Sequence, residues 1–298
     1  MSYSDLLNFD KYCASSYDTA LEQIEVTEKQ LTKIGIRISS NSRLVKYRRT
    51  IHDLIRVARD KAAVAHPDLN LLHQALYEFD QLAMIVEQLA TTSVDTRLMT
   101  RLQELVSGHD LPSTEAAHTP ARDAQFELYV AACCVKSGLK VYIAEPDLLI
   151  DFRGKRIAVA AKRPKSISKL ESHIRKARKQ IVGSGQDGIV ALDMSHIHNV
   201  PNFAFEVATK EEAVQAVREV ADSFVDRNSA RLFHLARAPQ IFGLMVCVRT
   251  RFLITEIPQL SSSTRWTFAN LCASSDSRYN VIRELAGIFS RAYDSESI

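Results

Sequence analysis

The sequence predicts a mixed α/β fold with an all-helical N-terminal region. In residues 1–108 apolar side chains recur every three or four positions, which is the spacing of one helix face. From residue 140 onward, short apolar runs bounded by turn residues indicate β-strands. Helical and strand-like segments then alternate toward the C-terminal region, an order typical of a sheet with helices on both faces.

Four apolar stripes predict antiparallel helices in a bundle in the first part of the chain. Gly35 follows the first stripe, Pro67 and Asp68 precede the third, and Gly108 follows the last. Residues 111–120 contain two prolines and small polar side chains, which are typical of a linker. We therefore expect a helical domain at residues 1–110, a linker at 111–120 and a second domain at 121–298. The apolar stripes could also support a homodimer.

The second domain is expected to run helix, three strands, helix, strand, and then a further helix and strand. The expected helices cover residues 121–136, 170–182, 211–225 and 279–293. The expected strands cover residues 140–144, 148–152, 156–161, 188–193 and 241–248. Residues 261–277 are polar and predict a loop-rich stretch.

Composition limits the classes of function. The formal net charge is +3, so nucleic-acid binding would require a local basic patch. The five cysteines are odd in number and show no zinc-ligand spacing, which favours reduced thiols and a cytoplasmic protein. The sequence opens without a signal-peptide pattern and has no apolar run of the ~18 residues that a membrane span needs. We expect no membrane association.

A hairpin carries the most informative side chains. Asp147 opens the first hairpin strand, the chain turns at Arg153 and Gly154, and Lys162 closes the second strand. The start of one strand should therefore lie beside the end of the next. A carboxylate there can hold a divalent cation, and an ammonium can orient water or stabilise transition-state charge. Strand side chains alternate, so residue 160 shares the face of Lys162, yet Ala160 offers no oxygen.

This arrangement resembles the core of the PD-(D/E)xK nuclease superfamily, the restriction-endonuclease-like fold, over roughly residues 121–250. The resemblance implies an α-β-β-β-α-β core and an endonuclease that uses Mg²⁺ or Mn²⁺, with Asp147 and Lys162 in the catalytic centre. It implies Glu127, on the first core helix, as an accessory metal ligand, and Gln180 as an accessory polar residue. The chain departs from the family pattern at Ala160, where the superfamily usually carries Asp, Glu or Gln.

A basic patch surrounds the predicted catalytic lysine. Residues 153–179 hold eleven Lys and Arg side chains against Glu171 alone, in a chain whose net charge is only +3. Such a concentration is expected where a phosphate backbone binds. The candidates for phosphate contacts are Arg163, Lys165, Lys169, Arg175, Lys176 and Lys179.

Three explanations of Ala160 stay open. The chain could be a degenerate member that binds nucleic acid without cutting, Glu127 could supply the missing ligand, or residue 160 could have been altered to trap an inactive state. We favour an endonuclease lineage acting on DNA, with RNA as a second candidate, that is weakened or inactive in this chain. Its expected setting is bacterial defence, with a protein partner in a defence complex. The alternative is a non-catalytic nucleic-acid-binding or assembly protein.

Overall fold

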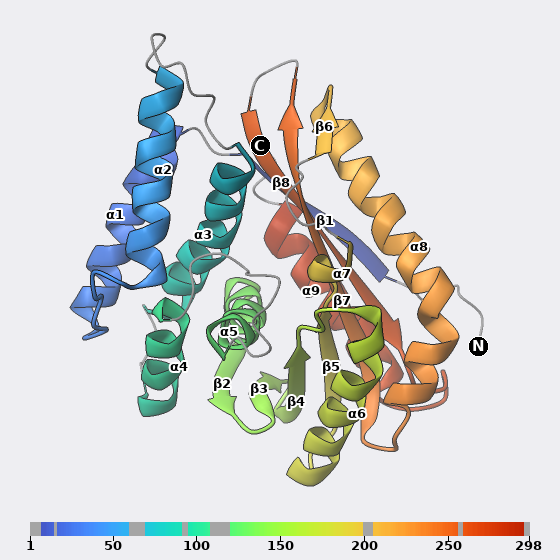
Figure 1. The fold of residues 1–298 in the computed structure, drawn as a ribbon. Coiled ribbons are helices and arrows are strands. Elements are labelled where there is room, and N and C mark those ends of the chain that lie inside the picture. Colours follow the sequence, from blue (N-terminus) through green and yellow to red (C-terminus); the bar gives the residue numbers. More distant parts are fainter. Residues whose placement is uncertain are drawn as a thin grey trace.

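The computed structural model describes residues 7–14, 17–59, 69–90, 95–107, 120–198, 205–255 and 259–294. These residues form a mixed α/β structure in which helices cover both faces of one sheet (Figure 1). The strands are β1 Leu7–Ala14, β2 Lys140–Ala144, β3 Asp147–Phe152, β4 Lys155–Lys162, β5 Gly188–Asp193, β6 Phe205–Val207, β7 Ile241–Ile254 and β8 Gln259–Asn270. The helices are α1 Tyr17–Lys33, α2 Arg43–Arg59, α3 Leu69–Leu89, α4 Thr96–Val106, α5 Pro120–Lys136, α6 Ile167–Ser184, α7 Ser195–His198, α8 Lys210–Ala236 and α9 Tyr279–Asp294.

The sheet is mixed, in the order β1-β8-β7-β5-β4-β3-β2, with β6 beside β7. Strands β2, β3 and β4 are antiparallel neighbours, whereas β4, β5 and β7 run parallel. The β3–β4 hairpin turns at Arg153 and Gly154, whose φ angles are 52° and 74°. Positive φ at two successive turn residues is the requirement of the tight turn that joins right-twisted strands. The predicted hairpin is confirmed.

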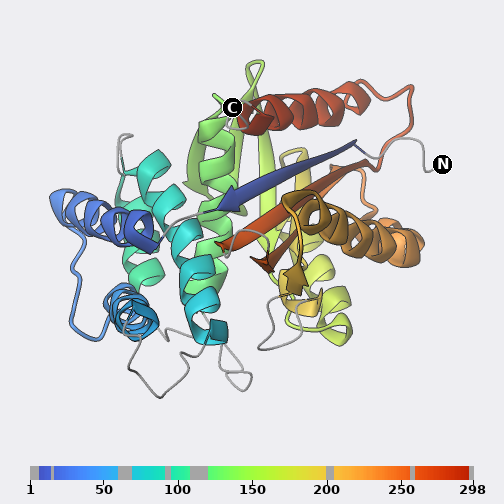
Figure 2. The ribbon, with the colours of Figure 1, turned by 90° about the horizontal axis from the view of Figure 1, so that it is seen from above.

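Alternating side chains of β4 divide the apolar interior into two layers. Val159 and Ala161 belong to the cluster on the side of α5 and α9, and Ala160 belongs to the cluster on the side of α6 and α8. Figure 2 shows α8 and α9 on opposite faces of the sheet. The period-two alternation expected from the sequence is therefore present at the strand that ends in Lys162.

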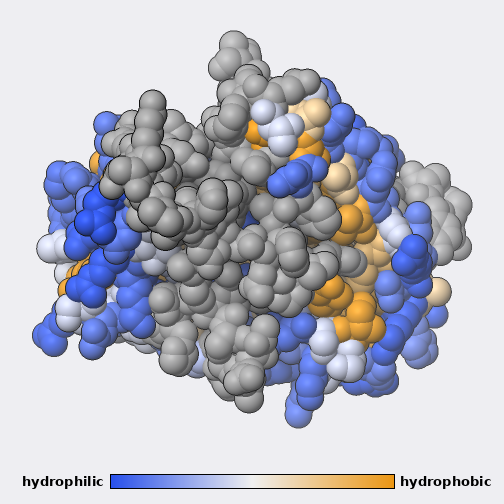
Figure 3. All heavy atoms as spheres, turned by 45° about the horizontal axis from the view of Figure 1, so that its top comes forward, coloured by the Kyte–Doolittle hydropathy of each residue, from blue (hydrophilic) through white to orange (hydrophobic). Residues whose placement is uncertain are grey.

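Helices α3 and α4 pack against α5, and α1 and α2 pack against α3. One apolar cluster runs from these helices through α5 to the sheet. The outer faces of α1 and α2 are hydrophilic, as the left side of Figure 3 shows. Of the expected linker, residues 111–119 lie outside the described residues and Pro120 is the first residue of α5. None of the described helices has the length and apolarity needed to cross a membrane.

A buried ion network joins the N-terminal helices to the sheet. Glu78 on α3 binds Arg43 of α2 at 3.1 Å and also accepts a short hydrogen bond from Arg122 of α5. The side chain of Arg43 is fully buried and also donates to the Gln125 side-chain oxygen at 2.6 Å. Arg163, directly after β4, lies 3.9 Å from the same Glu78 carboxylate. The network therefore ties three helices to the end of β4.

Two sequence predictions about secondary structure are wrong. The first segment is not helical throughout, because β1 pairs with β8 at the edge of the sheet, with Leu7 opposite Phe268. Residues 261–270 are not a loop but part of β8, which is paired on both sides. Serine and threonine give β8 a polar composition, but two hydrogen-bonding neighbours satisfy its backbone, so the strand is stable and buried. Helix α8 and strand β7 are also longer than expected, while β5 has the expected bounds.

Glu78→Ala should destabilise the fold strongly. Removal of this carboxylate leaves Arg43 and Arg122 buried without their shared counter-ion, which typically costs about 3–5 kcal/mol. The measurement is the free energy of unfolding from urea titration. The control is Glu25→Ala, which removes an exposed pair with Lys29 and should leave the urea midpoint unchanged. Equal small effects of both substitutions would contradict a structural role for the network.

Candidate active site

Asp147 and Lys162 meet at the end of the β3–β4 hairpin. The Lys162 ammonium donates to Asp147 Oδ2 at 2.6 Å, and the backbone N–H of Ala161 donates to the same oxygen at 2.8 Å. Lys162 also donates to the Ala161 carbonyl at 2.9 Å. Both side chains are buried. Burial raises the pKa of the Asp147 carboxyl, and the nearby Lys162 opposes that shift. The hairpin thus brings the start of β3 beside the end of β4, as the spacing predicts, and there Asp147 and Lys162 form a buried ion pair.

Glu127 reaches the same region from α5. Its side chain is buried, and its Oε2 lies 3.1 Å from Arg101 Nη2 of α4. Burial and, to a smaller extent, the Asp147 charge raise the pKa of Glu127 to about 7, although Arg101 and Lys162 oppose the shift. Such a value arises where two carboxylates share a site with little water. The prediction that Glu127 belongs near Asp147 and Lys162 agrees with this geometry.

Ala160 lies where an acid would complete the group. Leu148 pairs with Val159, and this register puts Asp147 opposite residue 160 on the face toward α6. Directly opposed residues on one face are typically ~4.5–5.5 Å apart at their Cβ atoms. Ala160 is fully buried, in the apolar cluster that contains Leu170 and Ile174 of α6. An acid at this position would be next to Asp147 but partly enclosed by apolar side chains.

Gln180 lies beside the site, on the side of α6. Its amide nitrogen donates to the carbonyl of Pro146 at 3.2 Å, directly before Asp147, while its buried side-chain oxygen has no hydrogen-bond partner. His173, four residues after Lys169 on the same helix, is half-buried. Burial lowers the pKa of His173, and the Lys162 charge acts in the same direction. α6 therefore supplies polar groups near the Asp147–Lys162 pair.

Arg163 is not a phosphate-binding residue in this geometry. Its guanidinium is buried, with Nε 3.0 Å from Asp193 Oδ2 at the end of β5. Burial lowers the pKa of Arg163, but Asp193 and Glu78 outweigh that effect and raise it. Proximity in sequence to Lys162 suggested an exposed cation, whereas strand alternation turns Arg163 into the interior network. The burial of Arg163 and its pairing with Asp193 do not favour the predicted phosphate contact.

The remaining candidates of the basic patch are exposed. They are Lys165 before α6 and Lys169, Arg175, Lys176 and Lys179 on α6. Arg175 pairs with Glu171 at 2.6 Å, one turn earlier on the helix. The charges of Lys169 and Lys176 lower the pKa of His173, and the charge of Lys162 lowers it too. This cationic face therefore borders the buried pair. The exposed face of α6 thus lies near the buried Asp147–Lys162 pair.

Asp147 and Glu127 would provide only two protein ligands for Mg²⁺. Mg²⁺ is commonly held by one or two protein carboxylates together with water and substrate phosphate oxygens. Asp147 and Glu127 meet that minimum, and the Glu127 Oε2 atom is buried without a hydrogen bond. Within the described parts of the chain, however, no group of three or more His, Cys, Asp or Glu side chains could hold a metal ion. Ala160, at the position opposite Asp147, contributes no ligand.

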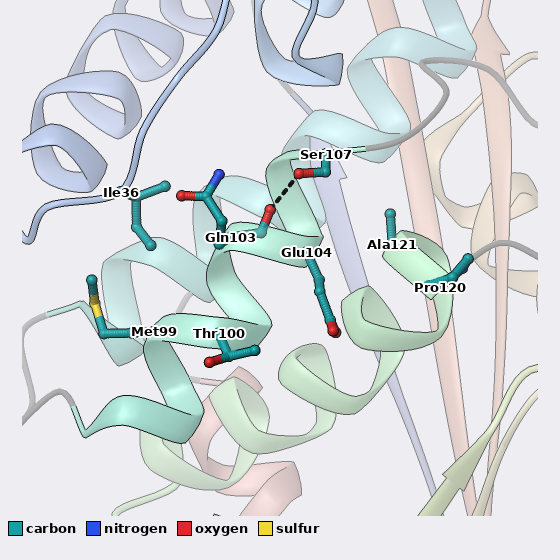
Figure 4. A pocket seen from close by; sticks show the side chains of 8 residues that line it. All are labelled: Ile36, Met99, Thr100, Gln103, Glu104, Ser107, Pro120 and Ala121. Carbon is teal, nitrogen blue, oxygen red and sulfur yellow. Dashed lines mark hydrogen bonds between the residues drawn. The ribbon is translucent and has the colours of Figure 1, made fainter.

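Sequence reasoning missed Arg101 and the pocket beside it. Arg101 is far from Glu127 in sequence and on the other side of the expected linker, so no local spacing pointed to their contact. A pocket of about 330 Å³ lies between α4 and residues 143–147, and Arg101 and Asp147 both line it. A second, more apolar pocket of about 560 Å³ lies between Ile36, α4 and the start of α5, where Met99 and Ala121 contribute apolar surface (Figure 4).

The chain matches no family model, and a search of the curated proteins found no match. Functional inference therefore depends on the geometry of the site.

Glu127→Gln should remove a pH dependence of stability. Burial raises the pKa of Glu127 from 4.5 to about 7 in the folded chain. This raised pKa stabilises the fold at pH values below the pKa that Glu127 has in the unfolded chain. The stabilisation is lost as pH rises through the pKa of the folded chain. From about pH 4 to about pH 8, the wild type should lose on the order of 3 kcal/mol more unfolding free energy than Glu127→Gln.

Urea titration at several pH values measures this difference. The control is Glu104→Gln, which removes the other carboxylate partner of Arg101 and should retain the pH dependence. Parallel stability–pH curves for the wild type and Glu127→Gln would contradict the raised pKa.

Proposed function

We propose that this chain is a metal-dependent endonuclease of the restriction-endonuclease-like type that hydrolyses DNA, with activity weakened by Ala160. The observation that carries the proposal is the buried Asp147–Lys162 pair, 2.6 Å apart, with Glu127 beside it. The order α5-β2-β3-β4-α6-β5 and the pairing of these strands support the α-β-β-β-α-β core that the resemblance implies. The exposed cations of α6 supply a surface for the phosphate backbone.

Each residue has a distinct role in this proposal. Asp147 and Glu127 would hold Mg²⁺ or Mn²⁺, which when bound lowers the pKa of a water molecule and neutralises the scissile phosphate. Lys162 orients the attacking water or stabilises the charge of the pentavalent transition state. The backbone N–H of Ala161 and the Lys162 ammonium fix the orientation of the Asp147 carboxylate. Gln180 holds the Pro146 carbonyl and so supports the backbone at Asp147.

The pKa of Glu127 gives this centre a pH requirement. Below about pH 7 the Glu127 carboxyl is mostly protonated and is a poor metal ligand. Above that pH it carries the charge that a divalent cation needs. Defence against foreign DNA, a partner protein and a homodimer formed through the helical bundle stay predictions, since they rest on the resemblance or on the apolar stripes alone.

A second candidate is a nucleic-acid-binding protein without catalysis. The observation that favours it is the full burial of Ala160 in an apolar cluster beside α6, which leaves two carboxylates where a nuclease centre would have three. In that case the Asp147–Lys162 pair would stabilise the hairpin, and the basic face of α6 would bind the phosphate backbone.

Cleavage of plasmid DNA distinguishes the two candidates. Ala160→Glu puts a carboxylate opposite Asp147 and should raise Mg²⁺- or Mn²⁺-dependent cleavage by about 10²-fold or more, the typical contribution of a correctly placed catalytic group. Lys162→Ala and Asp147→Asn should abolish cleavage in either background. Thermal unfolding of each variant shows whether the chain tolerates the charge at residue 160.

The matched control is Asp151→Asn. Asp151 lies on the same strand as Asp147 and alternates to the same face, but it pairs with Arg156 near the turn. Its substitution should leave cleavage unchanged. If folded Ala160→Glu protein cut neither DNA nor RNA while the wild type bound both in a salt-sensitive way, the non-catalytic candidate would replace the nuclease.

Substitution of the basic face should weaken DNA binding and its salt dependence. A variant with Lys169→Gln, Lys176→Gln and Lys179→Gln removes three exposed cations of α6. If each contacts one phosphate, the slope of log K against log salt should fall by about 0.9 per lysine. Fluorescence anisotropy with a labelled duplex measures both quantities.

The control for this test is a variant with Lys29→Gln, Lys33→Gln and Arg37→Gln, which removes three exposed cations of α1 and the segment that follows it. This control variant changes the net charge by the same amount as the α6 variant, and it should leave the slope of log K against log salt unchanged. Equal effects of the two triple variants would mean that α6 has no specific role in binding.

A further inference from the structure

The pocket between α4 and the β2–β3 connection opens beside the proposed catalytic centre. Its volume is about 330 Å³, and its walls are Thr96, Arg97, Thr100, Arg101 and Glu104 of α4 and residues 143–147. Small-molecule sites usually occupy ~300–1,000 Å³, so this pocket suits a ligand of about one nucleotide. Asp147 forms one end of the pocket and also binds Lys162, so the pocket and the catalytic pair share a residue.

Two arginines of α4 line this pocket, and they differ in their ion pairing. Arg97 and Arg101 are four residues apart and therefore share a helix face. Arg101 is bound to Glu104 at 2.8 Å and lies 3.1 Å from Glu127. Arg97 is exposed and makes no ion pair within the part of the chain that the structure describes. Arg97 is therefore the cation that can take up a new anionic partner.

The pocket is placed where a DNA strand bound at the catalytic pair can enter it. Helix α4 packs against α5, on one side of the sheet, and the lysines of α6 lie on the other side. The Asp147–Lys162 pair is between them. A strand whose phosphodiester lies at Lys162 can continue toward α6 in one direction and enter the pocket in the other.

Resting on the proposed function, we infer that this pocket is a nucleotide subsite next to the scissile position, and that Arg97 binds its phosphate. A guanidinium suits this role because its planar fork of N–H donors matches a phosphate group. Arg101 pairs with both Glu104 and Glu127 and so reduces the negative charge that these two acids present to a phosphate, while Asp147 is paired with Lys162. The helical bundle thus contributes directly to substrate binding.

Glu145 provides an independent test of the sign of the ligand charge. This exposed carboxylate also lines the pocket. It repels an anion in the pocket and attracts a cation. Its neutralisation should therefore strengthen the binding of a phosphate and weaken the binding of a cationic ligand.

The experiment is binding of a fluorescein-labelled DNA duplex, by anisotropy without divalent cations and over a series of salt concentrations. Arg97→Gln should weaken binding roughly tenfold and lower the salt slope by about 0.9, as expected for the loss of one phosphate contact. Arg97→Lys should retain part of the affinity. Glu145→Gln should tighten binding roughly two- to fivefold.

The α6 triple variant separates failure of this inference from failure of the proposed function. If that variant weakens binding and Arg97→Gln does not, the subsite is overturned and the nuclease proposal stands. Weaker binding by Glu145→Gln would likewise overturn an anion subsite. If none of the variants weakens binding in a salt-dependent way, DNA binding itself fails, and the proposed function fails with it.

Discussion

The buried carboxylate of Glu78 is the interaction on which the rest of the structure depends. It compensates Arg43 and Arg122, lies 3.9 Å from Arg163, and is itself almost fully enclosed. Buried ions lose several kcal/mol of hydration each, so such a network is tolerable only while every member keeps its partners. Arg122 and Arg163 belong to the sheet side of the molecule, and Glu78 belongs to α3. The N-terminal helices therefore complete the charge balance of the sheet and are not an independent attachment.

Ion pairs at the end of β4 connect the Glu78 network to the candidate site. Lys162 binds Asp147 on β3, and the next residue, Arg163, binds Asp193 on β5. The two adjacent cations thus hold the end of β4 between its neighbouring strands. Arg249 of β7 adds a similar contact to α3, through Asp80 at 2.9 Å and the ring of Tyr77. The helices and the strand ends that carry the site should consequently keep a fixed geometry relative to one another.

The electrostatics of the site centre on two buried carboxylates, Asp147 and Glu127. Lys162 has Asp147 as a close partner, Arg101 has Glu104 and Glu127, and Glu127 still has a pKa of about 7 because it is buried near Asp147. A proton can relieve the repulsion between these carboxylates, and so can a divalent cation. A third carboxylate opposite Asp147 would favour the cation over the proton. Alanine at residue 160 adds no such charge, which under the proposed function is a physical reason for weakened metal binding.

The sequence by itself determined the features that depend on neighbours along the chain. Helix and strand periods located most elements, the positive-φ turn at Arg153 and Gly154 set the hairpin register, and that register brought Asp147 to Lys162. Only the tertiary structure decided which exposed-looking charges are internal and which distant segments pair. Arg163 turns inward to Asp193, Arg101 reaches Glu127 from α4, and β1 pairs with β8 from the opposite end of the chain. These contacts depend on burial and on pairing between remote segments, and neither leaves a periodic signal in the local sequence.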